Sequence, residues 1–95
     1  MTALNPPFDQ AQLDLIRRFL RHHFPGSNTV ETFDAERTAQ QFTINPQGPN
    51  QHTLLVMRDA LDHPDLAALL DERLVDALEH AGGKPVSLTA QGARY

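Results

Sequence analysis

The sequence contains no cysteine. The chain can therefore form no disulfide, and it offers no thiolate for redox chemistry or for metal binding. Its amino terminus also lacks the charged and then apolar pattern of a secretory signal peptide. Together these absences predict a cytoplasmic protein.

Long hydrophobic runs are absent as well. Uninterrupted apolar stretches such as Leu54 to Met57 are short, whereas a membrane span requires roughly 20 apolar residues. We therefore expect no contact with a membrane. The length of 95 residues predicts a single domain over residues 1–95, because a second core would be undersized. So short a domain buries only about 60% of the surface that its unfolded chain exposes, which makes pairing with a second copy attractive.

Basic residues are few, with 8 Lys and Arg against 12 Asp and Glu and a formal net charge of −4 at pH 7. This balance opposes a general affinity for nucleic acid phosphates. The charge is uneven, because residues 59–79 hold seven acids and a single base, Arg73. The remaining positive charge gathers in one predicted helix near the amino terminus.

Patterns that carry catalysis or ligand binding are missing too. The five histidines show no HxH or HExxH spacing, so no metal site is predicted. Neither Ser27 nor Ser87 belongs to a GxSxG or SxxK pattern. The glycines lack the spacing of a phosphate-binding loop. We predict no catalytic residue and no cofactor, and an enzyme is the less favoured class.

Hydrophobic periodicity and turn residues divide the chain into successive elements. A leader with two consecutive prolines comes first and a flexible tail comes last. Between them, helices follow from apolar residues three and four apart, and strands from alternation or from short apolar runs. The expected elements are a leader at 1–8, a helix at 9–23, strands at 29–33, 37–44 and 51–58, a helix at 62–81, a strand at 84–89 and a tail at 91–95.

This order, α-β-β-β-α-β, predicts an α+β fold in which two helices pack on one face of a four-stranded, mainly antiparallel sheet. The third strand does not alternate, since all four residues of its Leu54 to Met57 run are apolar. Such a strand is either covered on both faces within the chain or meets a partner. Leu69 falls in the polar sector of the second helix. We therefore expect a homodimer whose apolar interface includes Leu55, Met57 and Leu69.

The first helix carries a cationic stripe, formed by Arg17, Arg18 and Arg21. Asp14 lies three and four residues before two of them, so these arginines could simply form a solvated, ion-paired face. The alternative is that the stripe binds an acidic partner through bidentate contacts. We expect a small interaction or regulatory module that binds itself and an unidentified protein. A second possibility is a small nucleic-acid-associated protein that uses this stripe.

Overall fold

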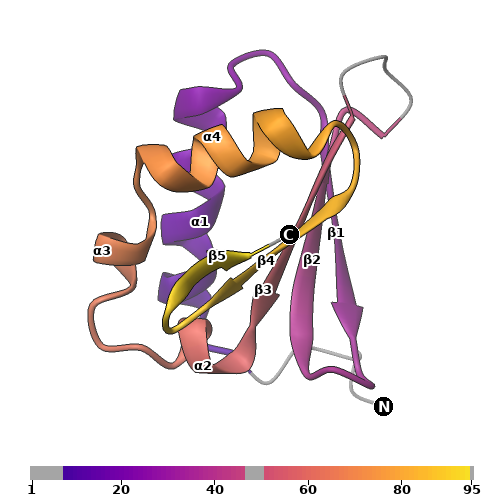
Figure 1. Cartoon of the computed structure of the whole chain (residues 1–95). Helices are drawn as coiled ribbons and strands as arrows, with labels where there is room; N and C mark the ends of the chain where they lie inside the picture. Colours follow the sequence, from indigo (N-terminus) through magenta and orange to yellow (C-terminus); the bar gives the residue numbers. More distant parts are fainter. Residues whose placement is uncertain (1–7, 47–50, 95) are drawn as a thin grey trace.

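A computed structural model describes residues 8–46 and 51–94 of the chain. Figure 1 shows one curved sheet with helices gathered on one side of it. The elements are α1 (Gln10–His23), β1 (Thr29–Asp34), β2 (Ala39–Ile44), β3 (His52–Met57), α2 (Arg58–Leu61), α3 (Leu66–Leu69), α4 (Glu72–Ala81), β4 (Pro85–Thr89) and β5 (Gly92–Arg94).

The five strands lie in the order β1-β2-β3-β4-β5. Neighbouring strands are antiparallel except β3 and β4, which are parallel. The α+β class is thus confirmed, but the sheet is mixed and has five strands rather than four. Parallel neighbours need a crossover connection, because the chain must return to the end of the sheet where the first strand begins before the next strand can start. The segment carrying α2, α3 and α4 makes that crossover.

The first helix forms as predicted. The Asp9 carboxylate accepts a hydrogen bond from the Ala11 amide at 2.9 Å and so caps the amino terminus of α1. Leu13, Ile16 and Leu20 are buried along one side. The helix ends before Pro25, which disfavours helical backbone in the residue that precedes it.

The predicted second helix at 62–81 is wrong as a single element. Between α3 and α4 the backbone of Leu70 is not helical, with φ −93° and ψ 80°. Asp71 is extended, and its carboxylate accepts hydrogen bonds from the amides of Arg73 and Leu74. An aspartate that caps a new helix in this way competes with continuation of the old one. Gly82, at φ 58°, ends α4 as predicted.

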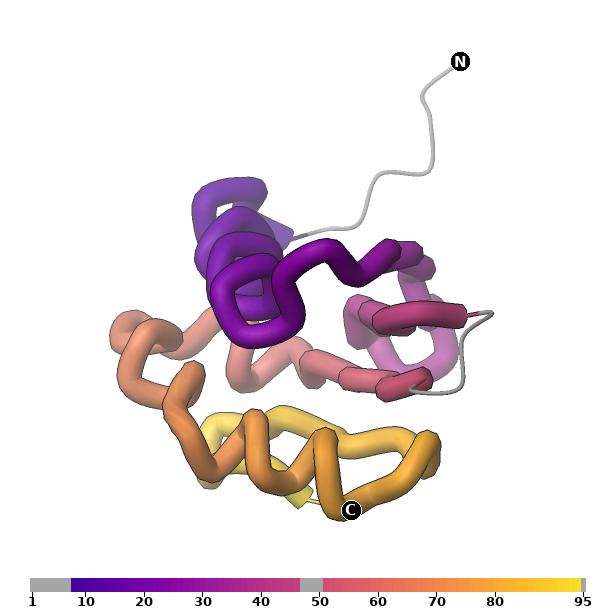
Figure 2. The backbone as a smooth tube through the Cα atoms, turned by 90° about the horizontal axis from the view of Figure 1, so that it is seen from above, coloured from indigo at the N-terminus to yellow at the C-terminus, as the bar shows by residue number. Residues whose placement is uncertain are grey.

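The two ends of the chain also differ from expectation. Residues 92–94, expected in a flexible tail, form β5 and pair with β4. The leader expected at 1–8 lies outside the described residues except for Phe8, which is buried and contacts the Phe33 ring edge-on. Figure 2 shows α4 running beside β4 and β5, and α1 lying apart from it.

One apolar cluster lies between the helices and the sheet. Its sheet side includes Phe42, Leu54 and Val86, and these three share one face because each is paired with its neighbour across the ladder. The alternation predicted for the second strand is confirmed for Ala39–Ile44, since Phe42 and Ile44 are buried in this cluster. Residues 37 and 38, also expected in that strand, lie in the turn before it. All four helices lie on this side (Figure 1), which leaves the opposite face of the sheet without a helix among the described residues.

Candidate functional site

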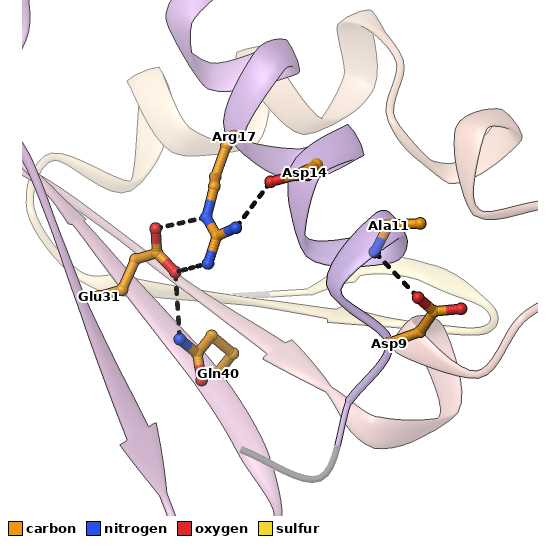
Figure 3. Close-up of polar contacts among 6 residues, drawn as sticks. All are labelled: Asp9, Ala11, Asp14, Arg17, Glu31 and Gln40. Atoms are coloured by element: carbon orange, nitrogen blue, oxygen red, sulfur yellow. Dashed lines mark hydrogen bonds and ion pairs between the residues drawn. The ribbon is translucent and has the colours of Figure 1, made fainter. Parts of the chain in front are cut away.

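Arg17 joins α1 to the sheet through a network of charged hydrogen bonds (Figure 3). Its Nε and one terminal nitrogen donate to the two carboxylate oxygens of Glu31 on β1, at 2.7 and 2.8 Å. Its other terminal nitrogen donates to Asp14 at 2.7 Å. Glu31 also accepts a 3.2 Å hydrogen bond from the Gln40 amide on β2. All guanidinium nitrogens of Arg17 therefore serve contacts within the chain.

The network lies at the border between core and solvent. The side chains of Arg17 and Glu31 are 30% and 27% exposed, and Gln40 is 5% exposed. The hydrogen bonds that Arg17 donates to Glu31 and Asp14 raise its pKa above the ordinary range, so the guanidinium stays charged at any physiological pH. The Gln40 Oε1 atom is buried and accepts no hydrogen bond from the described residues.

The cationic stripe is thus divided by the structure. Arg17 is held against the sheet, and its predicted pairing with Asp14 is present. Arg18 and Arg21 are exposed, and within residues 8–46 and 51–94 neither forms an ion pair. The positive charge available for a partner therefore comes from these two residues rather than from three.

The helix-free face of the sheet is a second candidate surface. The residues on this face follow from the strand register. They are the residues of each strand that alternate with those of the buried cluster. On the three central strands these residues carry no charge: Ala39, Gln41, Thr43, Thr53, Leu55, Met57, Pro85, Ser87 and Thr89. The charged side chains of this face, Asp34 and Arg94, lie on the outer strands β1 and β5.

The three apolar residues predicted to form an interface are in different environments. Leu55 and Met57 lie on the helix-free face, where Leu55 is only 5% exposed and Met57 is half-buried. Leu69 is also half-buried, but it packs against the main cluster on the helix side. The structure therefore brings Leu55 and Met57 together and places Leu69 on the other side of the sheet.

The third region is a hollow between the end of α1 and the end of α4. The hollow has a volume of about 480 Å³ and is lined by Phe24, His52 and Glu79 among others. The Nδ1 atom of His52 lies 3.0 Å from the Leu78 carbonyl oxygen. A carbonyl can only accept, so Nδ1 carries a proton and donates it in this hydrogen bond. His52 thereby satisfies one of the free carbonyls at the end of α4.

Metal binding finds no support in the part of the chain that is described. No group of three or more His, Asp or Glu residues there is arranged to hold a metal ion. The same residues include no helix with the length and apolar character of a membrane span.

Sequence reasoning missed the partner of Arg17 and missed Val30. Val30 is the large hydrophobic residue that the described surface exposes most, at 47%. Extending the alternation of the second strand to the first would have placed Glu31 on the helix side and Val30 on the other. No pattern in the sequence shows that Arg17 lies above Glu31, because that contact depends on how α1 crosses the sheet.

Comparisons with protein-family models, with curated proteins and with solved structures found no match to this chain.

Proposed function

We propose that this protein is a non-enzymatic interaction module that forms a homodimer through the helix-free face of its sheet. One observation carries the proposal: the three central strands present no charged side chain on that face, although the protein carries 20 charged residues (8 basic and 12 acidic). A sheet face that only meets water is usually polar and charged. Depletion of charge at the centre of a surface is typical of protein interfaces.

The side chains on this face suit the packing of one sheet on another. Threonine, serine and glutamine are short or uncharged, and Val30 and Met57 add apolar surface. Two such faces can pack about 10 Å apart with their strands nearly aligned. Because Leu55 is already covered within the chain, the gain on pairing comes mainly from the residues around it.

The size of the face predicts a reversible dimer. Five strands about 4.8 Å apart and about six residues long make a face of roughly 20 by 20 Å. Two copies would bury on the order of 1,000 Å² together, which is below the roughly 1,600 Å² of a standard stable interface. We therefore expect dissociation in the micromolar range.

Light scattering and sedimentation across a concentration series test this proposal. The expected mass rises from 10.6 kDa towards twice that value. Gln41 and Ser87 flank Leu55 on the two neighbouring strands, so Gln41→Lys with Ser87→Lys puts like charges at the centre of the face. We expect this variant to be monomeric. Its free energy of unfolding should lie within about 0.5 kcal/mol of that of the unchanged protein.

A lysine at the exposed Ala11 of α1 is the matched control, and it should leave the dimer intact. The proposal is wrong if the unchanged protein stays monomeric at several hundred micromolar. It is also wrong if the double-lysine variant dimerises as well as the control does.

The nucleic-acid alternative rests on Arg18 and Arg21, which are exposed and form no ion pair with the described carboxylates. Titration with duplex DNA and duplex RNA at two salt concentrations separates it from the main proposal. Phosphate binding weakens steeply as salt rises, whereas burial of uncharged surface does not.

A further inference from the structure

The outer edge of β1 is a second surface, separate from the helix-free face. β1 is the first strand of the sheet and is six residues long. Among residues 8–46 and 51–94, no strand pairs with its outer side. An unpaired edge offers a row of backbone donors and acceptors that an extended segment can use.

The ladder between β1 and β2 shows which backbone groups face outward. Just before the strands, the Asn45 amide donates to the Asn28 carbonyl at 2.7 Å, and this pair continues the register Thr29↔Ile44. In an antiparallel pair, hydrogen-bonded and non-hydrogen-bonded positions alternate. Val30, Thr32 and Asp34 therefore bond to β2. The amides and carbonyls of the other three residues, Thr29, Glu31 and Phe33, point away from the sheet.

A free cation stands beside this edge. α1 and β1 run in opposite directions (Figure 1), and Arg17 on α1 contacts Glu31 on β1. Arg21 lies four residues further along the helix, or about 6 Å. Thr29 lies two residues back along the strand, about 6.6 Å in the same direction. The exposed Arg21 is therefore level with Thr29, whose amide faces outward.

We propose that the outer edge of β1 binds an extended, acidic segment of another protein as a sixth strand. The backbone of the segment would pair with Thr29, Glu31 and Phe33. One of its carboxylates would meet Arg21 on the helix side, and an apolar side chain would cover Val30 on the other side.

Charge selects an acidic segment rather than a basic one. Three guanidiniums and two carboxylates lie along this flank, from Arg17, Arg18, Arg21, Asp14 and Glu31, which leaves a net charge of +1. Both carboxylates are bonded to Arg17, so the charge that is free to bind is positive.

Charge also disfavours a second copy at this edge. Two β1 strands related by a twofold axis would place both α1 helices on the same face and next to each other. Each α1 helix carries Arg17, Arg18 and Arg21 but a single acid, Asp14, and two such positively charged helices side by side oppose association. The helix-free face holds no such conflict at its centre, so the two proposals use different surfaces and can fail separately.

Amide hydrogen exchange on the full chain tests the proposal. The probe is a capped octapeptide in which aspartate alternates with valine or threonine, and its control has lysine in place of aspartate. In the free protein the amides of Thr29, Glu31 and Phe33 should exchange fast, whereas those of Val30 and Thr32 should be slow. The acidic peptide should slow the three fast amides, and the lysine peptide should not.

Two variants separate the backbone contact from the charge contact. Thr29→Pro removes an outward amide without touching the ladder to β2, and proline is tolerated at the start of an edge strand. It should abolish binding, whereas Thr29→Val should retain it. Arg21→Glu should weaken the peptide Kd about tenfold, and Arg73→Glu, exposed on α4, should leave it unchanged.

Three results would overturn the inference. In the first, the lysine peptide slows the same amides as well as the acidic peptide does. In the second, the acidic peptide leaves all three amides fast. In the third, these amides become slow in the free protein as its concentration rises, which would mean that a second copy occupies the edge.

Discussion

Removing the guanidinium of Arg17 should destabilise the protein measurably. Arg17→Met removes it and leaves an unbranched apolar side chain in place of the arginine stem. The change deletes three charged hydrogen bonds, two to Glu31 and one to Asp14. It also leaves Glu31, 27% exposed, beside Gln40 without its cation. The exposed ion pair with Asp14 contributes little, because solvent-exposed pairs are worth about 0 to 1 kcal/mol.

The bidentate contact with Glu31 sets the size of the effect. Charge-assisted hydrogen bonds contribute about 1.5 to 3 kcal/mol when water is excluded. With about a third of each side chain exposed, solvent screening reduces this contribution. We expect Arg17→Met to lower the free energy of unfolding by about 1.5 kcal/mol, or the melting temperature by roughly 6 to 12 °C in a domain of this size.

Urea denaturation of a double-mutant cycle measures the interaction directly. The partner change is Glu31→Gln, which keeps the shape and removes the charge, and the coupling between the two changes should be about 1 kcal/mol. Arg18→Met is the matched control, since Arg18 forms no ion pair among the described residues. The reasoning is refuted if Arg17→Met costs no more than Arg18→Met, or if the coupling is zero.

Chemical denaturation also tests several other features of the fold. Asp71→Ala should cost about 1 kcal/mol, because it removes the carboxylate that accepts from the first amides of α4; no loss would mean that the cap is not formed in solution. Leu74→Ala, at a site 1% exposed, should cost about 2 to 5 kcal/mol, and Leu69→Ala about half as much because Leu69 is half-buried against the same cluster. A negligible cost at Leu69 would instead favour the single continuous helix that the sequence pattern predicts, with Leu69 on its exposed side. Thr38→Gly should stabilise by about 0.5 to 1 kcal/mol, since a β-branched residue at φ 50° is strained; destabilisation would exclude that backbone conformation. His52→Ala should cost about 1 kcal/mol through loss of the hydrogen bond to the Leu78 carbonyl, and an unchanged midpoint would contradict that bond.

The sequence by itself determined the elements whose causes are local. Asp9 caps α1, and apolar residues three and four apart give the helix its buried side. The alternation of β2 and the glycine that ends α4 were equally readable. Each of these features depends on residues within one or two turns of each other, and so the pattern is complete within a short window of sequence.

Tertiary structure decided the features that depend on distant residues. The three residues of β5 are too few to show a period, and they form a strand because β4 lies beside them. The apolar spacing of residues 62–81 fits a continuous helix. Asp71 nevertheless begins a new one, and the interruption places Leu69 against the core.

The candidate surfaces divide in the same way. The absence of charge on alternate residues of the central strands can be read from the sequence once their strand phase is known. The role of Arg17 cannot, because its bond to Glu31 joins residues 14 positions apart. That bond forms only because the core packs α1 over β1, and it leaves Arg21 exposed beside an edge whose free amides are set by the ladder to β2.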